Sequence, residues 1–168
     1  MASTSSFDVT TGVDFMEVHN AVDQTTKEIT QRYDFKGVKT EITLNQKEKK
    51  ITLAAPDDYK LTAIWDVLQS KMVRRGVPLK NLKLGDPLPA LMGSARQEIA
   101  ITDGLTAEVA RDVVRALKDA KLRKVQSSIQ GDTVRVSSAS KDDLQGVMAL
   151  LKQHDFGVEL KFGNYRSN

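Results

Sequence analysis

The sequence predicts an α+β fold built from two consecutive units, each with the element order β-α-β-β-α-β. Short stretches of alternating apolar and polar residues indicate strands, and longer stretches with apolar residues three or four positions apart indicate helices. The same order of elements occurs on both sides of the Pro- and Gly-rich segment DPLPALMGSA. This order is that of a ferredoxin-like sheet with both helices on one face. We therefore predict two tandem ferredoxin-like units, residues 1–90 and 91–168.

The first unit begins with the strand SFDVT, in which Phe7 and Val9 share a face. A helix over 14–32 follows, because Phe15, Val18, Val22 and Ile29 form an apolar stripe and Asp14 is placed to cap it. VKTEITL and ITLAA form a hairpin across the polar turn NQKEKK. The second helix occupies PDDYKLTAIWDVLQSKMVRRG, and LKNLKLG is the fourth strand.

The second unit repeats this order with the strand RQEIAIT and the helix TAEVARDVVRALKDA. KVQSSIQG and DTVRVSS form a hairpin, for which the tight turn at Gly131 and Asp132 is a strong signal. SKDDLQGVMALLKQ is a helix that Ser140 can cap, and VELKFGNY is the last strand. With both helices on one side, the second face of each sheet is open to a ligand or partner.

The composition excludes several kinds of protein. The chain has 168 residues, a formal net charge of +3 and no cysteine, which rules out disulfides, zinc–thiolate sites and cysteine nucleophiles. The N-terminal residues are polar and no apolar run approaches the ~18 residues of a membrane span. We expect a cytoplasmic protein that does not associate with membranes.

Catalytic signatures are absent, so we expect neither enzymatic activity nor a cofactor or metal. The sequence has no phosphate-binding loop, no GxGxxG and no HExxH. The acidic pairs at 57–58 and 142–143 open helices, where carboxylates satisfy free N–H groups. His19 and His154 are far apart in the sequence and are interpreted as structural residues.

An RNA-recognition module has the same order of elements, but it stacks bases on aromatic residues of its third strand. Neither ITLAA nor DTVRVSS contains an aromatic residue, which disfavours base stacking on the sheet. Basic residues offer a better signal, because Lys118, Lys121 and Lys124 lie around a predicted helix end. Cations at the C-terminal end of a helix interact favourably with the helix dipole, and these lysines could also hold phosphates. Lys71, Arg74 and Arg75 end the second helix in the same way.

The stretch RYDFKG, residues 32–37, joins the first helix to the second strand. Tyr33 continues the apolar stripe and is predicted to be core, which leaves Arg32, Phe35 and Lys36 without an obvious structural role. An aromatic face beside two cations suits a nucleobase and its phosphate. The alternative is an aromatic plug that closes one end of the sheet.

The chain resembles the YajQ family of bacterial nucleotide-binding proteins over nearly its whole length. The stretches that carry this resemblance are SFDV, NAVDQTTKEITQRYDFKG, KDAKLRKVQSSIQGDTVRVSS, KDDLQGVMALLK and KFGNYR. It implies that the two units exchange their N-terminal strands, so that SFDV pairs within the second unit. It also implies binding of GTP, of cyclic di-GMP with downstream effects through a transcription regulator, or of tRNA.

The resemblance also implies a set of ligand contacts, in which cations take phosphates, Phe35 or Tyr165 stacks on a base and Asp34 accepts from guanine. The predicted contacts are Arg32, Asp34, Phe35, Lys36, Lys118, Lys121, Gln126, Gln130, Arg135, Asn164, Tyr165 and Arg166. The leading hypothesis is a non-catalytic effector that binds a guanine nucleotide. The alternatives are an RNA-binding protein that contacts the tRNA backbone, and an undetected enzyme acting on nucleotides.

Overall fold

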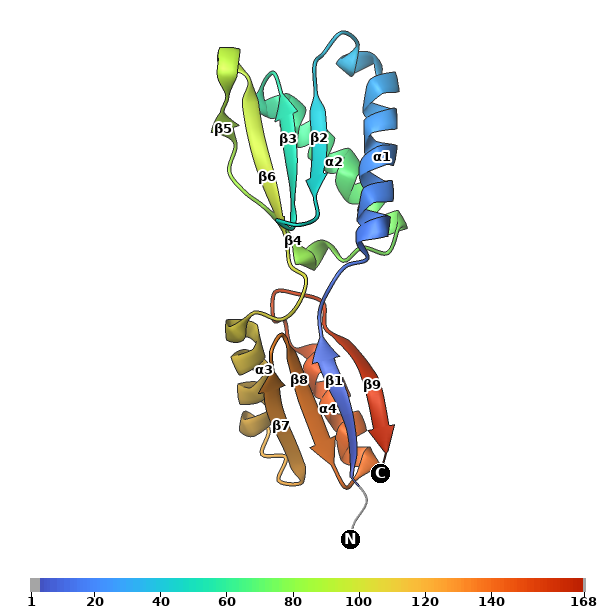
Figure 1. Ribbon diagram of the computed structural model, residues 1–168, viewed down its shortest axis with the longest axis vertical. Helices are drawn as coiled ribbons and strands as arrows, with labels where there is room; N and C mark the ends of the chain where they lie inside the picture. The colour runs from blue at the N-terminus through green and yellow to red at the C-terminus, as the bar shows by residue number, and fades with distance from the viewer. Residues whose placement is uncertain (1–3, 168) are drawn as a thin grey trace. The chain divides into compact units, whose positions relative to one another are not determined.

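The computed structural model describes residues 4–167, which form two compact units (Figure 1). One unit is continuous in sequence and comprises Val13–Thr102. The other, here called the discontinuous unit, joins the residues up to Gly12 with those from Asp103 onward. Each unit has its own sheet and its own apolar core, so each is described by itself.

The discontinuous unit contains four strands and two helices in an antiparallel sheet of order β7-β8-β1-β9. The elements are β1 Ser5–Thr10, α3 Ala107–Asp119, β7 Val125–Gln130, β8 Thr133–Ser138, α4 Lys141–Gln153 and β9 Lys161–Ser167. Alternate residues of the inner strands β1 and β8 form the core with α3 and α4. Because the side-chain period of a strand is two, the residues between them face the other side of the sheet.

The continuous unit has a sheet of order β2-β3-β6-β4, with a short strand β5 also paired to β6. The elements are α1 Phe15–Gln31, β2 Glu41–Asn45, β3 Lys50–Ala55, α2 Asp58–Arg74, β4 Leu82–Leu84, β5 Leu88–Pro89 and β6 Ala95–Ile101. Helices α1 and α2 pack against each other and against this sheet (Figure 1).

The helices begin and end where the sequence predicts. Asp14, Asp57, Thr106 and Ser140 each accept a backbone N–H in the first turn of α1, α2, α3 and α4. Helix α2 ends at Arg74, and Gly76 just beyond it has φ +73°, which lets the Val77 N–H donate to the Met72 carbonyl. The predicted apolar stripe of α1 faces the core.

The two units exchange their opening strands, as the resemblance implies. Strand β1, which opens the predicted first unit, is an inner strand beside β8 and β9. Strand β6, which opens the predicted second unit, is an inner strand beside β3 and β4. The predicted boundary between residues 90 and 91 is therefore displaced, because backbone pairing assigns each of these strands to the other sheet.

Among residues 4–167 there is no helix whose length and apolar character would let it cross a bilayer.

Candidate nucleotide-binding face

The face of the discontinuous unit's sheet that α3 and α4 leave uncovered is lined by polar side chains. Cross-strand pairing aligns Ser128, Arg135 and Asp8 on β7, β8 and β1. A second row aligns Gln126, Ser137, Ser6 and Arg166 across all four strands. Residues paired in this way share a face of the sheet. We call this surface the open face; it combines amides, hydroxyls and guanidinium groups.

Asp8 connects three strands at the centre of the open face. The Arg135 Nε donates to its Oδ1 at 3.0 Å, and the Asn164 Nδ2 donates to its Oδ2 at 2.7 Å. The hydrogen bond from Arg135 is the main reason that the pKa of Asp8 lies below its ordinary value, although burial opposes the shift. The same bond raises the pKa of Arg135. Since it engages Nε, the terminal amino groups of Arg135 remain for a ligand.

A β-bulge in β9 decides which tail residues reach the open face. The register of β9 on β1 shifts between Ser6 and Asp8, and Asn164 has φ 54°. Asn164 and Arg166 consequently lie on the open face. Tyr165, between them, turns to the opposite face, where its ring lies 6.1 Å from that of Phe7.

The predicted stacking role of Tyr165 does not fit this placement. The Tyr165 hydroxyl donates to the Met148 Sδ at 3.6 Å, so the side chain packs with α4. The bulge adds one residue to β9, so the side chains after it alternate between the two faces in the opposite phase. Tyr165 therefore faces the helices. Sequence alternation alone gives no sign of this bulge, apart from Gly163 and Asn164 standing together in the strand.

The structure brings five of the twelve predicted contacts together on the open face. They are Gln126, Gln130, Arg135, Asn164 and Arg166. Lys118 and Lys121 belong to the same unit but line a hollow of about 520 Å³ beside the start of β7. Arg32, Asp34, Phe35 and Lys36 belong to the continuous unit.

In the continuous unit, Arg32 and Asp34 form a two-pronged ion pair. The Arg32 Nε and Nη2 donate to the two carboxylate oxygens of Asp34 at 2.9 and 2.7 Å. The hydrogen bond from Arg32 lowers the pKa of Asp34, and the hydrogen bond to Asp34 raises the pKa of Arg32. A guanine edge would have to compete with Arg32 for Asp34, which does not favour the predicted role of Asp34 as an acceptor.

The predicted roles of Tyr33 and Phe35 are reversed in the structure. Tyr33 is 91% exposed, whereas Phe35 is 4% exposed and belongs to the apolar core. The reason is that α1 ends at Gln31 and residues 33–35 form a 3₁₀ turn, which breaks the helical spacing on which the prediction for Tyr33 rested. Phe35 is the aromatic plug of the alternative interpretation, so it is not available to stack on a base.

Lys60 is a residue of this region that the sequence analysis missed. Its Nζ lies 4.6 Å from the centroid of the Phe35 ring and donates to the carbonyl of Asp34. Arg32 lies over the same ring at 5.5 Å. Lys60 comes 26 residues after Asp34, so no local signal in the sequence relates them. Lys36, which follows Phe35 in the chain, is exposed.

The basic end of α2 has a structural role. The Lys71 Nζ lies 3.0 Å from Glu28 Oε1, and Arg75 Nη1 lies 3.5 Å from Glu17 Oε2. Both ion pairs join α2 to α1. Lys71 and Arg75 are therefore poor candidates for phosphate contacts. Arg74 lies in the last turn of the helix, where a cation interacts favourably with the helix dipole.

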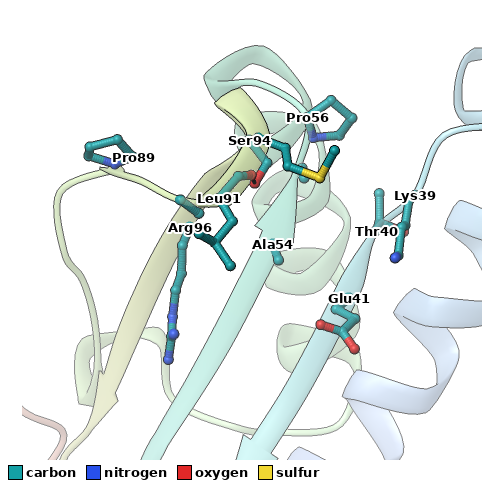
Figure 2. Close-up of a pocket in the computed structure, with 12 residues that line it drawn as sticks. Lys39, Thr40, Glu41, Ala54, Pro56, Pro89, Leu91, Ser94 and Arg96 are labelled. Atoms are coloured by element: carbon teal, nitrogen blue, oxygen red, sulfur yellow. Dashed lines mark hydrogen bonds between the residues drawn. The ribbon is translucent and has the colours of Figure 1, made fainter.

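A second hollow, of about 710 Å³, lies at one end of the continuous unit's sheet. Figure 2 shows Pro89 and Leu91 on the β6 side, Lys39 and Glu41 on the β2 side, and Ala54 of β3 between them. Two side chains of its lining are almost fully exposed, Leu91 at 89% and Met92 at 102%. None of the twelve predicted contacts lines this hollow.

The described residues contain no cluster of three or more His, Asp or Glu side chains arranged to hold a metal ion. His19 Nε2 lies 3.3 Å from Asp23 Oδ2 on the surface of α1, and the ring of His154 stacks on Phe156 at 5.7 Å. Both histidines thus make local structural contacts.

The open face is equipped to recognise a ligand through hydrogen bonds and positive charge.

Two ferredoxin-like units that exchange their opening strands, one of them with a polar open face, define the class of this protein. The family model described as nucleotide-binding protein YajQ-like matches residues 5–166. A protein of Solibacter usitatus named nucleotide-binding protein is 48% identical over 164 residues, which cover 98% of each chain. One of Carboxydothermus hydrogenoformans with the same name is 49% identical over 166 residues, 99% of this chain and 100% of the relative. The chain belongs to the YajQ-like family.

Proposed function

We propose that the protein binds a guanine nucleotide, such as GTP or cyclic di-GMP, on the open face of the discontinuous unit and acts as a non-catalytic effector. The observation that supports this most strongly is the convergence of Gln126, Gln130, Arg135, Asn164 and Arg166 on one sheet face. The names of the relatives support nucleotides as the class of ligand. Lys118 and Lys121 lie outside this proposed site.

The chemistry of the open face fits both parts of such a ligand. An arginine fork matches the O6 and N7 acceptors of guanine, and Arg135 is held in place by Asp8. Arg166 and Lys161 supply positive charge for phosphates from β9. The glutamine amides of β7 can donate and accept at a base edge or a ribose. Cyclic di-GMP carries two guanines and two phosphates, which would make use of more of the face than the single guanine of GTP does.

Calorimetric titration with cyclic di-GMP and GTP at two salt concentrations tests the proposal. A small nucleotide held by base contacts should lose little affinity as salt rises. Binding of tRNA with a steep loss of affinity in salt, and no binding of either nucleotide, would favour the RNA-binding alternative. Turnover of GTP in the presence of magnesium would contradict the non-catalytic role.

Matched variants locate the site. Arg166→Ala combined with Gln130→Ala should weaken nucleotide binding by about tenfold or more, since each removes a polar contact worth about 1 kcal/mol. Arg111→Ala removes an exposed arginine of α3 and should leave binding unchanged. Unaltered affinity in the double variant, with a native circular dichroism spectrum, would move the nucleotide away from the open face.

A further inference from the structure

Strand β7 is an edge of the discontinuous unit's sheet, since it pairs only with β8. Its six residues, VQSSIQ, contain no charge and no proline. Natural edge strands are protected against pairing with other chains by charges, prolines, bulges or short length. The side chain of Ile129 on β7 is 45% exposed. The Val125 N–H donates to the Leu122 carbonyl, but beyond Val125 the outer edge of β7 has no charge, proline or bulge that would oppose pairing with another chain.

The other edge strands of the two sheets are β9, β4, β5 and β2, and each carries such protection; β5 has only two residues, one of them Pro89. Strand β9 has Lys161, Arg166 and the bulge at Asn164. Strand β4 has three residues and includes Lys83. Strand β2 has the exposed charge of Glu41 at its start. The open edge of β7 is thus specific to this position and is not a general property of the chain.

The hollow of about 520 Å³ beside the start of β7 is lined by apolar side chains, by Gln126 and Ser127, and by cations that are here called the positive rim. Leu117, Leu122 and Val125 contribute the apolar part. The cations that line it are Lys118, Lys121 and Arg123. Within residues 4–167, none of these three cations forms an ion pair with a carboxylate. Their positive charge is available to a partner.

We propose that β7 is a docking edge for an extended, acidic segment of a partner protein. The segment adds as a fifth strand beside β7, where its backbone pairs with the outer N–H and C=O groups. Its carboxylates lie against the positive rim of the hollow. This goes beyond the proposed nucleotide site, because the contacts are those of the strand edge and the cations, although Gln126 borders both the hollow and the open face.

The positive rim selects this occupant over two others. A second copy paired antiparallel through β7 would leave the two sets of cations at opposite ends of the shared edge, and the uncharged residues of its β7 would supply no carboxylate to neutralise them. A polynucleotide would satisfy the cations, but it lacks the regular alternation of N–H and C=O groups that an edge strand pairs with. An acidic peptide satisfies both the backbone edge and the charges.

The test uses the full chain and a short synthetic peptide of alternating threonine and glutamate, with a lysine-for-glutamate version as the comparison. Nuclear magnetic resonance of the labelled protein should show binding of the acidic peptide, with slowed amide exchange of outward N–H groups within 126–130. The lysine version should not bind. Failure of the acidic peptide to bind, or equal binding of both peptides, would overturn the proposal.

Charge-reversal variants distinguish a specific role of the positive rim from an effect of the net charge of the protein. Lys118→Glu with Lys121→Glu should weaken acidic-peptide binding by about tenfold or more. Arg111→Glu with Lys141→Glu makes the same change in net charge on α3 and α4 away from the hollow, and should have a much smaller effect. Equal losses in the two variants, or slowed β7 amides with a single-stranded polynucleotide and not with the peptide, would contradict the proposed partner.

Discussion

At the scale of single residues, Asp8 is the side chain that holds the open face together. It is only 9% exposed, and it accepts hydrogen bonds from Arg135 of β8 and Asn164 of β9. Because β1 comes from the start of the chain and β9 from its end, these bonds join segments 127 and 156 residues apart. A carboxylate at this position both orders the open face and positions Arg135 for a ligand.

Asp8→Asn should lower the free energy of unfolding by about 1 kcal/mol near neutral pH, which is less than is typical of hydrogen bonds to charged groups because solvent reaches Arg135. The folded pKa of Asp8 is depressed, so its stabilising contribution is present above the ordinary value of 3.8 and is lost as the pH falls below it. Urea unfolding followed by circular dichroism should therefore show the two proteins converging below about pH 4.

Asp119→Asn is the control for this pH dependence, since Asp119 is exposed at the end of α3. Its free energy of unfolding should stay within about 0.5 kcal/mol of the parent at every pH. A constant difference between parent and Asp8→Asn down to pH 3 would mean that the ionised Asp8 carboxylate does not stabilise the unit.

Phe35 and Tyr33 form a natural pair for a second test. Phe35→Ala should destabilise the continuous unit by about 3 kcal/mol, because it empties a site in the core. Tyr33→Ala should change the free energy of unfolding by no more than about 0.5 kcal/mol, because its side chain is in solvent. Urea unfolding followed by the fluorescence of Trp65, the single tryptophan, reports on this unit. Equal effects would contradict the exchange of roles between the two aromatics.

The signature RYDFKG shows how far local reasoning reaches at this scale. Residue types predicted a junction between helix and strand, which the structure confirms. They did not predict which aromatic would be buried, because a single 3₁₀ turn after α1 changes the direction of both rings. They also gave no sign of Lys60, whose approach to Phe35 depends on the packing of α2.

At the scale of secondary-structure elements, the backbone requires glycine in the β7–β8 hairpin but not in α4. Gly131 has φ +61° in the tight turn between the two strands, a conformation that L-residues with a Cβ rarely adopt. Gly146 lies within α4, where a Cβ would meet nothing within 4 Å. The first glycine is required by backbone geometry, and the second is not.

Gly131→Ala should therefore destabilise the discontinuous unit by about 1 kcal/mol, through strain in the left-handed region. Gly146→Ala should stabilise it by about 1 kcal/mol, because alanine has the higher helix propensity and fits without a clash. Thermal unfolding measured side by side should give shifts of opposite sign. Destabilisation by Gly146→Ala would indicate that this surface of α4 is occupied.

The elements themselves were largely predictable from the sequence. Capping residues and apolar stripes located all four α-helices within a few residues, and the alternation of β3, β6 and β8 matches their burial. The bulge in β9 was missed because it depends on pairing with β1. It decides the placement of Asn164, Tyr165 and Arg166, and hence much of the candidate site.

At the scale of the whole molecule, each sheet depends on an inner strand from the other half of the sequence. The continuous unit contains every strand of its sheet within residues 13–102. Residues 1–90 would lack β6, which pairs with β3, β4 and β5. The topology therefore predicts which fragments can fold.

A fragment of residues 13–102 should fold cooperatively on its own, whereas residues 1–90 should not, since the latter lacks an inner strand. Dispersed amide resonances and a cooperative urea transition would confirm folding of the first fragment. Cooperative unfolding of residues 1–90 with similar stability would show that β6 is dispensable. That result would contradict the assignment of β6 to this sheet.

By itself the sequence determined the α+β class, the order of helices and strands and the lack of thiol chemistry, because capping, periodicity and composition act over a few neighbouring residues. The tertiary structure alone decided that Phe35 is core, that Asp8 joins three strands, and that five predicted contacts share one face. These outcomes rest on strand pairing and packing between distant segments, which no local pattern encodes.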